Sequence, residues 1–288
     1  MYYMETKKRK RIALPLVCIV IAIIIWIIWG NVTIGTTHYN ISSDRIPFSF
    51  DGYKIVQVSD LHNAVFGKDN DILLKKIHSE QPDVILLTGD LIDSNHTDVS
   101  AALEFTDAAS KIAPCYYVTG NHEAWIPRTD YESMERKLLE QGIIVLHNSS
   151  VDIVREGDSI SLFGVDDPSF AGAESSIQSS IVIRKLLEDV DRTENYSILL
   201  SHRPEAFDYY ATSGFDLVFC GHAHGGQFRL PLIGGIVAPN QGFFPKYDAG
   251  TYNENNMTMI VSRGLGNSII PVRINNRPEI VAVTLHHE

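Results

Sequence analysis

The stretch YKIVQVSDLH, Tyr53 to His62, sets the pattern that the rest of the chain repeats. Its β-branched first part predicts a buried strand, Tyr53–Ser59, and two potential metal ligands, Asp60 and His62, follow directly. Four more predicted strands end in polar residues in the same way, at Asp83–Thr88, Cys115–Thr119, Ser197–Leu200 and Asp216–Cys220. The residues that follow them are Gly89-Asp90, Gly120-Asn121-His122-Glu123, Ser201-His202 and Gly221-His222-Ala223-His224.

Segments with helical spacing of apolar residues alternate with these strands. We predict helices at Lys68–Ser79, Ser100–Ser110, Tyr131–Gln141, Ser175–Asp189 and Pro204–Thr212. Further strands are predicted at Ile143–Leu146, Val151–Val154, Ile160–Phe163, Thr258–Ser262 and Glu279–Leu285. Buried strands that alternate with helices indicate an α/β fold in layers, although the pattern alone does not distinguish one sheet from two. We therefore predict one domain, residues 52–288.

Composition and charge exclude several classes of protein. The chain has 288 residues, of which 44% are hydrophobic and 20% are charged, so it is neither disordered nor collagen-like. Three cysteines are too few for a disulfide framework. The net charge is −11, although the first 30 residues are basic, so the body of the protein should repel phosphate backbones. We expect no nucleic-acid partner.

The amino-terminal segment predicts a membrane anchor. Residues 1–11 end in a basic cluster, and the uncharged stretch Ile12–Trp29 is nearly long enough to cross a bilayer. We predict a cytoplasmic tail (1–11), a transmembrane signal-anchor helix (12–29) and a connector (30–51) with one strand, Thr36–Ile41. Basic residues favour the cytoplasmic side, so the predicted protein is a single-pass cell-membrane protein with an extracytoplasmic catalytic domain. The alternative is a cleaved signal peptide, but the apolar stretch is long and lacks an A-x-A site.

The polar residues that follow the five strands predict a metal site. In α/β layers, residues beyond the carboxyl ends of strands assemble into one site. Each motif alone is more often a turn or an ordinary buried histidine. Together they supply two aspartates, one asparagine and five histidines, a donor set that suits Mn, Fe, Zn or Ni. This number exceeds what one ion with an open position needs, and it suits two ions that share a carboxylate.

These motifs, in this order, resemble those of the calcineurin-like metallophosphoesterase superfamily. The superfamily pattern is Asp-x-His, Gly-Asp, Gly-Asn-His-Asp/Glu, a single His and Gly-His-x-His, and the similarity covers roughly Asp51 to Leu285. Three further stretches resemble a bacterial membrane-anchored branch that includes UDP-2,3-diacylglucosamine hydrolase-like phosphoesterases. They are LLSHRPE (Leu199–Glu205), GHAHGGQ (Gly221–Gln227) and SRGLGNSIIPVR (Ser262–Arg273).

The resemblance implies a fold and a role for each motif residue. The fold is a four-layer αββα sandwich. The first metal would be bound by Asp60, His62, Asp90 and His224, and the second by Asp90, Asn121, His202 and His222. Asp90 would bridge the two ions, and His122 would protonate or stabilise the leaving oxygen. Glu123 stands where the family more often has Asp, and it is expected to orient His122.

The implied reaction is the hydrolysis of a phosphate mono- or diester by attack of a metal-bound hydroxide. A lipid-linked phosphoester is one candidate substrate. Two alternatives stay open: a non-catalytic scaffold of the same fold, and a metal-dependent hydrolase of a non-phosphate ester. We leave Arg203 and Asp167 outside the predicted site, although both lie close to motif residues. The sequence does not identify the natural substrate, the metal or the oligomeric state.

Overall fold

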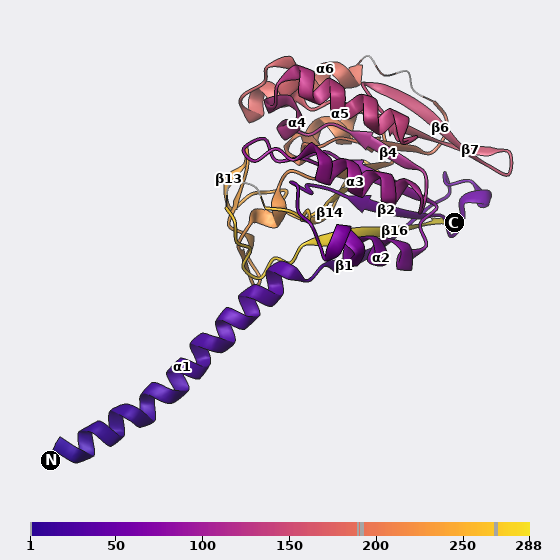
Figure 1. Cartoon of the computed structure of the whole chain (residues 1–288). Coiled ribbons are helices and arrows are strands. Elements are labelled where there is room, and N and C mark those ends of the chain that lie inside the picture. Colours follow the sequence, from indigo (N-terminus) through magenta and orange to yellow (C-terminus); the bar gives the residue numbers. More distant parts are fainter. Residues whose placement is uncertain (1, 189, 191–192, 268–269) are drawn as a thin grey trace.

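A computed structural model describes residues 2–188, 190, 193–267 and 270–288, with side chains from residue 15 onward. Two six-stranded sheets pack face to face, and helices cover both outer faces (Figure 1). This arrangement confirms the four-layer αββα fold. The long helix α1, Tyr2–Val32, projects from one end of the sandwich.

The first sheet carries three of the five metal-binding motifs. Its strands, in spatial order, are β1 (Gly35–Ser43), β16 (Glu279–His287), β2 (Lys54–Val58), β3 (Val84–Thr88), β4 (Cys115–Val118) and β5 (Ile144–Val145). Strands β2 to β5 are parallel, and β16 runs antiparallel to β2. The outer face is covered by α2 (Asp71–Glu80), α3 (Val99–Ser110) and α5 (Arg128–Glu140).

The second sheet carries the other two motifs. Its spatial order is β14 (Gly250–Glu254), β15 (Met257–Val261), β9 (Leu217–Cys220), β8 (Ser197–Leu200), β7 (Asp158–Gly164) and β6 (Ser149–Arg155). The four central strands are parallel to one another. The outer face is covered by α6 (Ser176–Glu188) and α7 (Phe207–Thr212).

The central strands are apolar along their whole length because both of their faces are buried. In β3, Val84 and Leu86 point into the core between the sheets, whereas Ile85 and Leu87 pack against the outer helices. Buried polar Gln57 joins the two sheets. Its amide donates to Thr88 Oγ1 (2.8 Å) and to the carbonyl of Cys220 (2.9 Å) at the ends of the motif strands. Because both hydrogens of its side-chain NH2 group are used in these contacts, Gln57 links the sheets directly beneath the motif loops.

The amino-terminal region consists of the long helix α1 and an edge strand. Among the residues whose side chains are described, from residue 15 onward, the window Pro15–Val32 is long and apolar enough to cross a membrane, and it overlaps the predicted span 12–29. The connector, 30–51, contributes a full edge strand, because β1 pairs with β16 from Gly35 to Ser43. Tyr39 and Ile41 on this strand pack against the core between the sheets. Most of the connector is therefore part of the sandwich.

Several short elements were not predicted. They are the helix α4 (Asn121–Trp125), the strand β14, and the two-residue strands β10 (Arg229–Leu230), β11 (Gly234–Gly235), β12 (Val237–Ala238) and β13 (Gly242–Phe243). Short 3₁₀ turns lie at Phe48–Phe50, Lys68–Asn70, Pro168–Ala171, Pro204–Ala206 and His224–Gly226. The predicted end of the α6 helix, Asp189, lies outside the described residues.

Candidate metal centre

The loops that follow β2, β3, β4, β8 and β9 meet at one end of the sandwich. Close contacts between them show this directly. The amide of Asp60 donates to the carbonyl of Gly89 (3.1 Å), and the amide of His222 donates to Asp60 Oδ1 (3.0 Å). Residues from both sheets are therefore in contact, as the rule for parallel strand ends predicts.

The loops adopt a backbone that is uncommon for residues other than glycine. Positive φ angles occur at five of the seven predicted metal ligands: Asp60, His62, Asp90, His222 and His224. Such conformations cost free energy and persist only where surrounding contacts enforce them, and they concentrate at functional sites. The loops are also closely packed against one another. A Cβ atom added to Gly120 would lie only 2.2 Å from Asp90 Oδ1, so this position has no room for a side chain.

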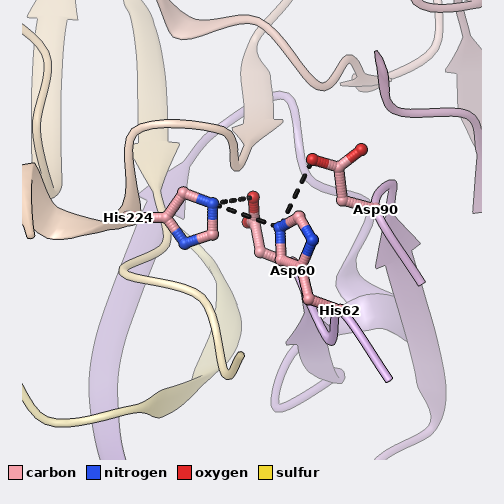
Figure 2. A group of neighbouring side chains, drawn as sticks. All are labelled: Asp60, His62, Asp90 and His224. Atoms are coloured by element: carbon pink, nitrogen blue, oxygen red, sulfur yellow. Dashed lines mark hydrogen bonds and ion pairs between the residues drawn. The ribbon is translucent and has the colours of Figure 1, made fainter. Parts of the chain in front are cut away.

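Asp60, His62, Asp90 and His224 form the first group of ligand atoms. All four are buried, and one ligand atom from each lies within 4.8 Å of the others. Figure 2 shows the side chains turned toward one another, with His62 Nε2 3.5 Å from Asp90 Oδ2 and 3.2 Å from His224 Nε2. Burial lowers the pKa of both histidines to about 3, so each ring is neutral and offers a lone pair. Neutral imidazoles beside carboxylates match the coordination preferences of a divalent cation.

Asp90, His202 and His222 form the second group, and Asp90 belongs to both. His202 Nδ1 lies 2.7 Å from the carbonyl of Thr88, so Nδ1 carries the hydrogen and Nε2 is left as the ligand atom. Nε2 is buried without a hydrogen-bond partner and lies 3.1 Å from Asp90 Oδ2. Asn121 Oδ1, at the start of α4, is also buried without a hydrogen-bond partner among the described residues. These two uncompensated acceptors fit a divalent cation.

The charges in the second group agree with this interpretation. Burial opposes a charge on His202, but the Asp90 carboxylate raises the pKa of His202 to about 10. Despite its own burial, Asp90 has a pKa well below its usual range, chiefly because His202 stabilises the carboxylate. The attraction between His202 and Asp90 shows that this point favours positive charge, and the residues present fit divalent metal binding.

His122 lies at the edge of the first group, and its ring stacks edge-on against His62 with centroids 4.4 Å apart. The main-chain amide of Ser94 donates to His122 Nδ1 (3.0 Å), and Ser94 Oγ lies 3.1 Å from the same atom. Asp93 Oδ1 is 3.7 Å away. Because Nδ1 accepts a hydrogen bond, the neutral ring carries its hydrogen on Nε2. No pattern in the sequence singles out Ser94 as the residue that fixes this tautomer.

Glu123 contacts the main chain of the neighbouring loop. Its carboxylate accepts hydrogen bonds from the main-chain amides of Gly120 (2.7 Å), Asp90 (2.9 Å) and Leu91 (2.8 Å). The side chain thus caps its own short helix and reaches the loop after β3. The expected role of Glu123 in orienting His122 stays a prediction. Burial, followed by the charge of Asp90, raises the pKa of Glu123 to about 7. Glu123 is a positioning residue for Asp90.

Two buried arginines complete the surroundings, and neither was placed in the predicted site. Arg203 forms a two-pronged ion pair with Asp167 (2.5 and 3.0 Å), and its Nη1 lies 2.8 Å from His222 Nε2. Arg273 donates to the carbonyl of Gly266 (2.5 Å) and lies 3.4 Å from His224 Nδ1. Both arginines therefore support histidines of the candidate metal centre from outside. In the sequence, Arg203 adjoins the motif residue His202, and Arg273 ends the stretch SRGLGNSIIPVR.

Comparison with known proteins agrees with this site. The family profile described as calcineurin-like phosphoesterase matches residues 53–226. An uncharacterised metallophosphoesterase of Bacillus subtilis, YkuE, is 32% identical over 267 residues, which is 88% of this chain and 85% of that protein. The phosphodiesterase YaeI of Escherichia coli is 27% identical over 81% of this chain and 82% of its own length.

Two further similarities concern architecture. A transmembrane protein with a metallophosphoesterase domain from Danio rerio is 31% identical over 84% of this chain, which corresponds to 55% of that protein. The solved structure of the sulfate thiohydrolase SoxB from Thermus thermophilus has a TM-score of 0.50 and 11% identity over 75% of this chain and 52% of that chain. At this identity, the structural similarity concerns the fold alone.

The profile match spans all five motifs, from the strand before Asp60 to the turn after His224. The matched residues include both groups of buried ligand atoms. The chain therefore belongs to the calcineurin-like phosphoesterase family and is a metal-dependent hydrolase.

Proposed function

We propose that this protein is a membrane-anchored phosphohydrolase that uses two divalent metal ions to cleave a phosphate mono- or diester. The observation that carries the proposal is the position of Asp90, whose carboxylate belongs to both groups of ligand atoms. A shared carboxylate is the usual bridge between two ions in hydrolytic sites. The similarity to a protein named as a phosphodiesterase supports phosphate esters as the substrate class.

Each proposed ion has a defined set of ligands. The first would be held by Asp60, His62, Asp90 and His224, and the second by Asp90, Asn121, His202 and His222. When bound, two such ions lower the pKa of water and offset the negative charge of a phosphate group. The chain itself fixes the ligands, because Thr88 sets the tautomer of His202 and Glu123 holds the main chain of Asp90.

His122 is proposed to stabilise the leaving oxygen. Its Nδ1 accepts from the amide of Ser94, so the hydrogen of the neutral ring is on Nε2. A hydrogen bond from Nε2 to the leaving oxygen would offset the negative charge that develops there. The ring is buried beside His62 and packs near Trp125, with centroids 5.0 Å apart, which restricts its orientation.

The proposed membrane anchor is helix α1. Its apolar window, Pro15–Val32, is exposed along its length and follows a basic tail in the sequence. β1 begins at Gly35, only three residues after α1 ends, and the Arg277 guanidinium lies 4.4 Å from the ring centre of Trp29. The catalytic domain would therefore lie directly on the bilayer, which favours a phosphoester linked to a lipid as the substrate.

The first prediction concerns the bridge. Asp90→Asn should reduce the metal content from about two ions per chain to one or none, because it removes the negative charge shared by both sites. Metal analysis of the purified full chain measures this directly. Asp98→Asn is the matched control, since Asp98 caps α3 by accepting from Ser100 and Ala101, and asparagine caps equally well. Unchanged metal content and normal turnover in Asp90→Asn would contradict the two-ion assignment.

The second prediction concerns His122. His122→Asn should keep the metal content and lower turnover by about 10²–10⁴-fold on esters with poor leaving groups. The loss should be much smaller on nitrophenyl esters, because a nitrophenolate leaves without help from a hydrogen-bond donor. Steady-state kinetics with a series of leaving groups measures the difference. Equal losses across the series would show that His122 acts by binding phosphate and not by stabilising the leaving oxygen.

The third prediction concerns topology. In a Cys18→Ser background, Val154→Cys on exposed β6 should react with a membrane-impermeant maleimide in intact cells whose wall has been removed. The remaining cysteines, Cys115 and Cys220, are buried and serve as the internal control. Labelling only after lysis, or a mature amino terminus beyond Gly30, would refute the retained, outward-facing anchor.

The fourth prediction concerns the substrate. With the full chain reconstituted in vesicles, a lipid-linked phosphodiester in the same bilayer should be hydrolysed faster than the same lipid in separate vesicles. A soluble phosphodiester should be hydrolysed at the same rate in both mixtures. Hydrolysis of soluble esters without turnover of any lipid-linked ester would contradict the lipid-linked substrate. It would show that α1 only attaches the protein to the membrane.

A further inference from the structure

A layer of short hairpins lies between the metal centre and the end of α1. It consists of residues 228–245, which contain β10 to β13, together with the neighbouring loop 272–277; we call it the hairpin layer. The two parts are joined by main-chain hydrogen bonds, such as that from the amide of Arg229 to the carbonyl of Ile274 (3.0 Å). None of the roles assigned to the metal centre accounts for the surface of this layer.

That surface is unusually apolar. Large hydrophobic side chains extend into solvent from both hairpins and from the loop, and we call them the apolar tips: Leu230, Leu232, Ile233, Phe243, Phe244, Val272 and Ile274. Phe243 is 78% exposed and Leu232 is fully exposed. A cluster of this kind on a soluble surface marks a contact with a partner or a membrane.

The backbone at the tips gives an independent reason to seek such a contact. Leu232 and Phe244 have φ angles of 69° and 54°, in the left-handed region where turns normally carry glycine or asparagine. A bulky apolar residue at such a position costs conformational free energy, and within the described chain neither side chain is buried. A contact outside the chain would offset both costs.

The charge of the layer indicates what it contacts. The layer, residues 228–245 and 272–277, contains three basic residues (Arg229, Arg273 and Arg277) and no acidic residue, in a chain whose net charge is −11. Arg273 is buried and Arg229 is paired with Asp248, so the positive charge at the surface comes from half-buried Arg277 and from exposed Lys246, which directly follows the layer. Apolar side chains beside these basic residues suit the interface of a bilayer that contains anionic lipids.

The layer is also fixed in position relative to α1. The Asn31 side chain, at the end of α1, donates to the carbonyl of Arg273 and accepts from its amide, both at 2.8 Å. A cavity of about 140 Å³ lies between this end of the helix and the loop, lined by Trp26, Trp29 and Arg277 among others. In Figure 1 the orange and yellow loops of this region reach the point where α1 joins the domain. The loop tips Val272 and Ile274 therefore lie beside the end of the candidate span, and the hairpins are joined to this loop through Ile274.

We propose that the apolar tips of the hairpin layer insert into the bilayer interface and form a second membrane contact beside α1. This inference rests on the membrane anchoring proposed above, but not on the catalytic activity. It also has a structural consequence for the metal centre. Asn240, in the turn between β12 and β13, lies 3.1 Å from His222 Nε2, so the layer that contacts lipid also contacts a metal ligand. The bilayer would thus hold the metal centre in a fixed orientation.

The test uses the full chain in vesicles of phosphatidylcholine and phosphatidylglycerol. In a Cys18→Ser background, an environment-sensitive fluorophore is attached to Phe243→Cys, and a matched label is placed on Val154→Cys, which is 68% exposed on β6. We expect the label at 243 to emit at shorter wavelength, to resist quenching by iodide and to be quenched several-fold more strongly by brominated lipid than the label at 154. Leu232→Cys provides a second site in case the first variant does not fold.

Two outcomes would overturn the inference. Equal exposure of the 243, 232 and 154 labels to iodide, with no quenching by brominated lipid, would show that the tips remain in water. Protection from iodide without quenching by brominated lipid would show that a protein covers them instead. Because the readout is fluorescence, inactivity toward phosphoesters would not affect it. Release of the full chain from the vesicles by high salt would separately refute the anchor on which the inference rests.

Discussion

Asp90 is the residue on which the site depends. Its side chain lies within reach of His62 and His202, and its Oδ1 accepts from the amide of His122 (2.9 Å). Its carbonyl accepts from the amide of His62 (3.0 Å), and its own amide donates to Glu123. A buried carboxylate is costly unless it is compensated, and here the compensation comes from three loops on two sheets. The loops can meet at this point only because the sheets pack face to face with their motif strands ending on the same side.

Much of this arrangement was predictable from local sequence. A strand that is buried on both faces reads as a short apolar run, and a polar residue directly after it marks the end of the strand. The five motif strands and the candidate ligand residues that follow them could therefore be found without a structure. The layered α/β class followed from the alternation of strands and helices. The division into two sheets did not follow, because it depends on which strands pair. The strand β2 of the first sheet and the strand β9 of the second are both short and largely apolar, so their sequences do not show that they belong to different sheets. Only the family resemblance supplied that step.

The sequence could not reveal contacts that depend on the direction of a side chain, nor short strands and turns that have no hydrophobic period. Glu123 lies next to His122 in the chain, yet its carboxylate turns to main-chain amides of the neighbouring loop. Arg203 and Asp167 are separated by 36 residues and form one buried pair behind His222. The short strands β10 to β13 contain two residues each, too few for any hydrophobic period to be visible. The contacts of Glu123 with Leu91 and of Arg203 with Asp167 join residues 32 and 36 positions apart, whereas the hairpin strands are local but too short to show a period.

Arg273 shows how the amino-terminal helix and the metal centre are physically connected. Its main chain binds Asn31 at the end of α1, and its guanidinium donates to Gly266 and approaches His224. Burial lowers the pKa of Arg273 to about 10, although Asp60 and Glu279 oppose the shift, so the charge is retained at a cost. A lysine would present a single point charge and could not reach several acceptors in one plane. The planar guanidinium therefore explains why an arginine occupies this position. A displacement of the helix end would be transmitted through one residue to a metal-binding loop.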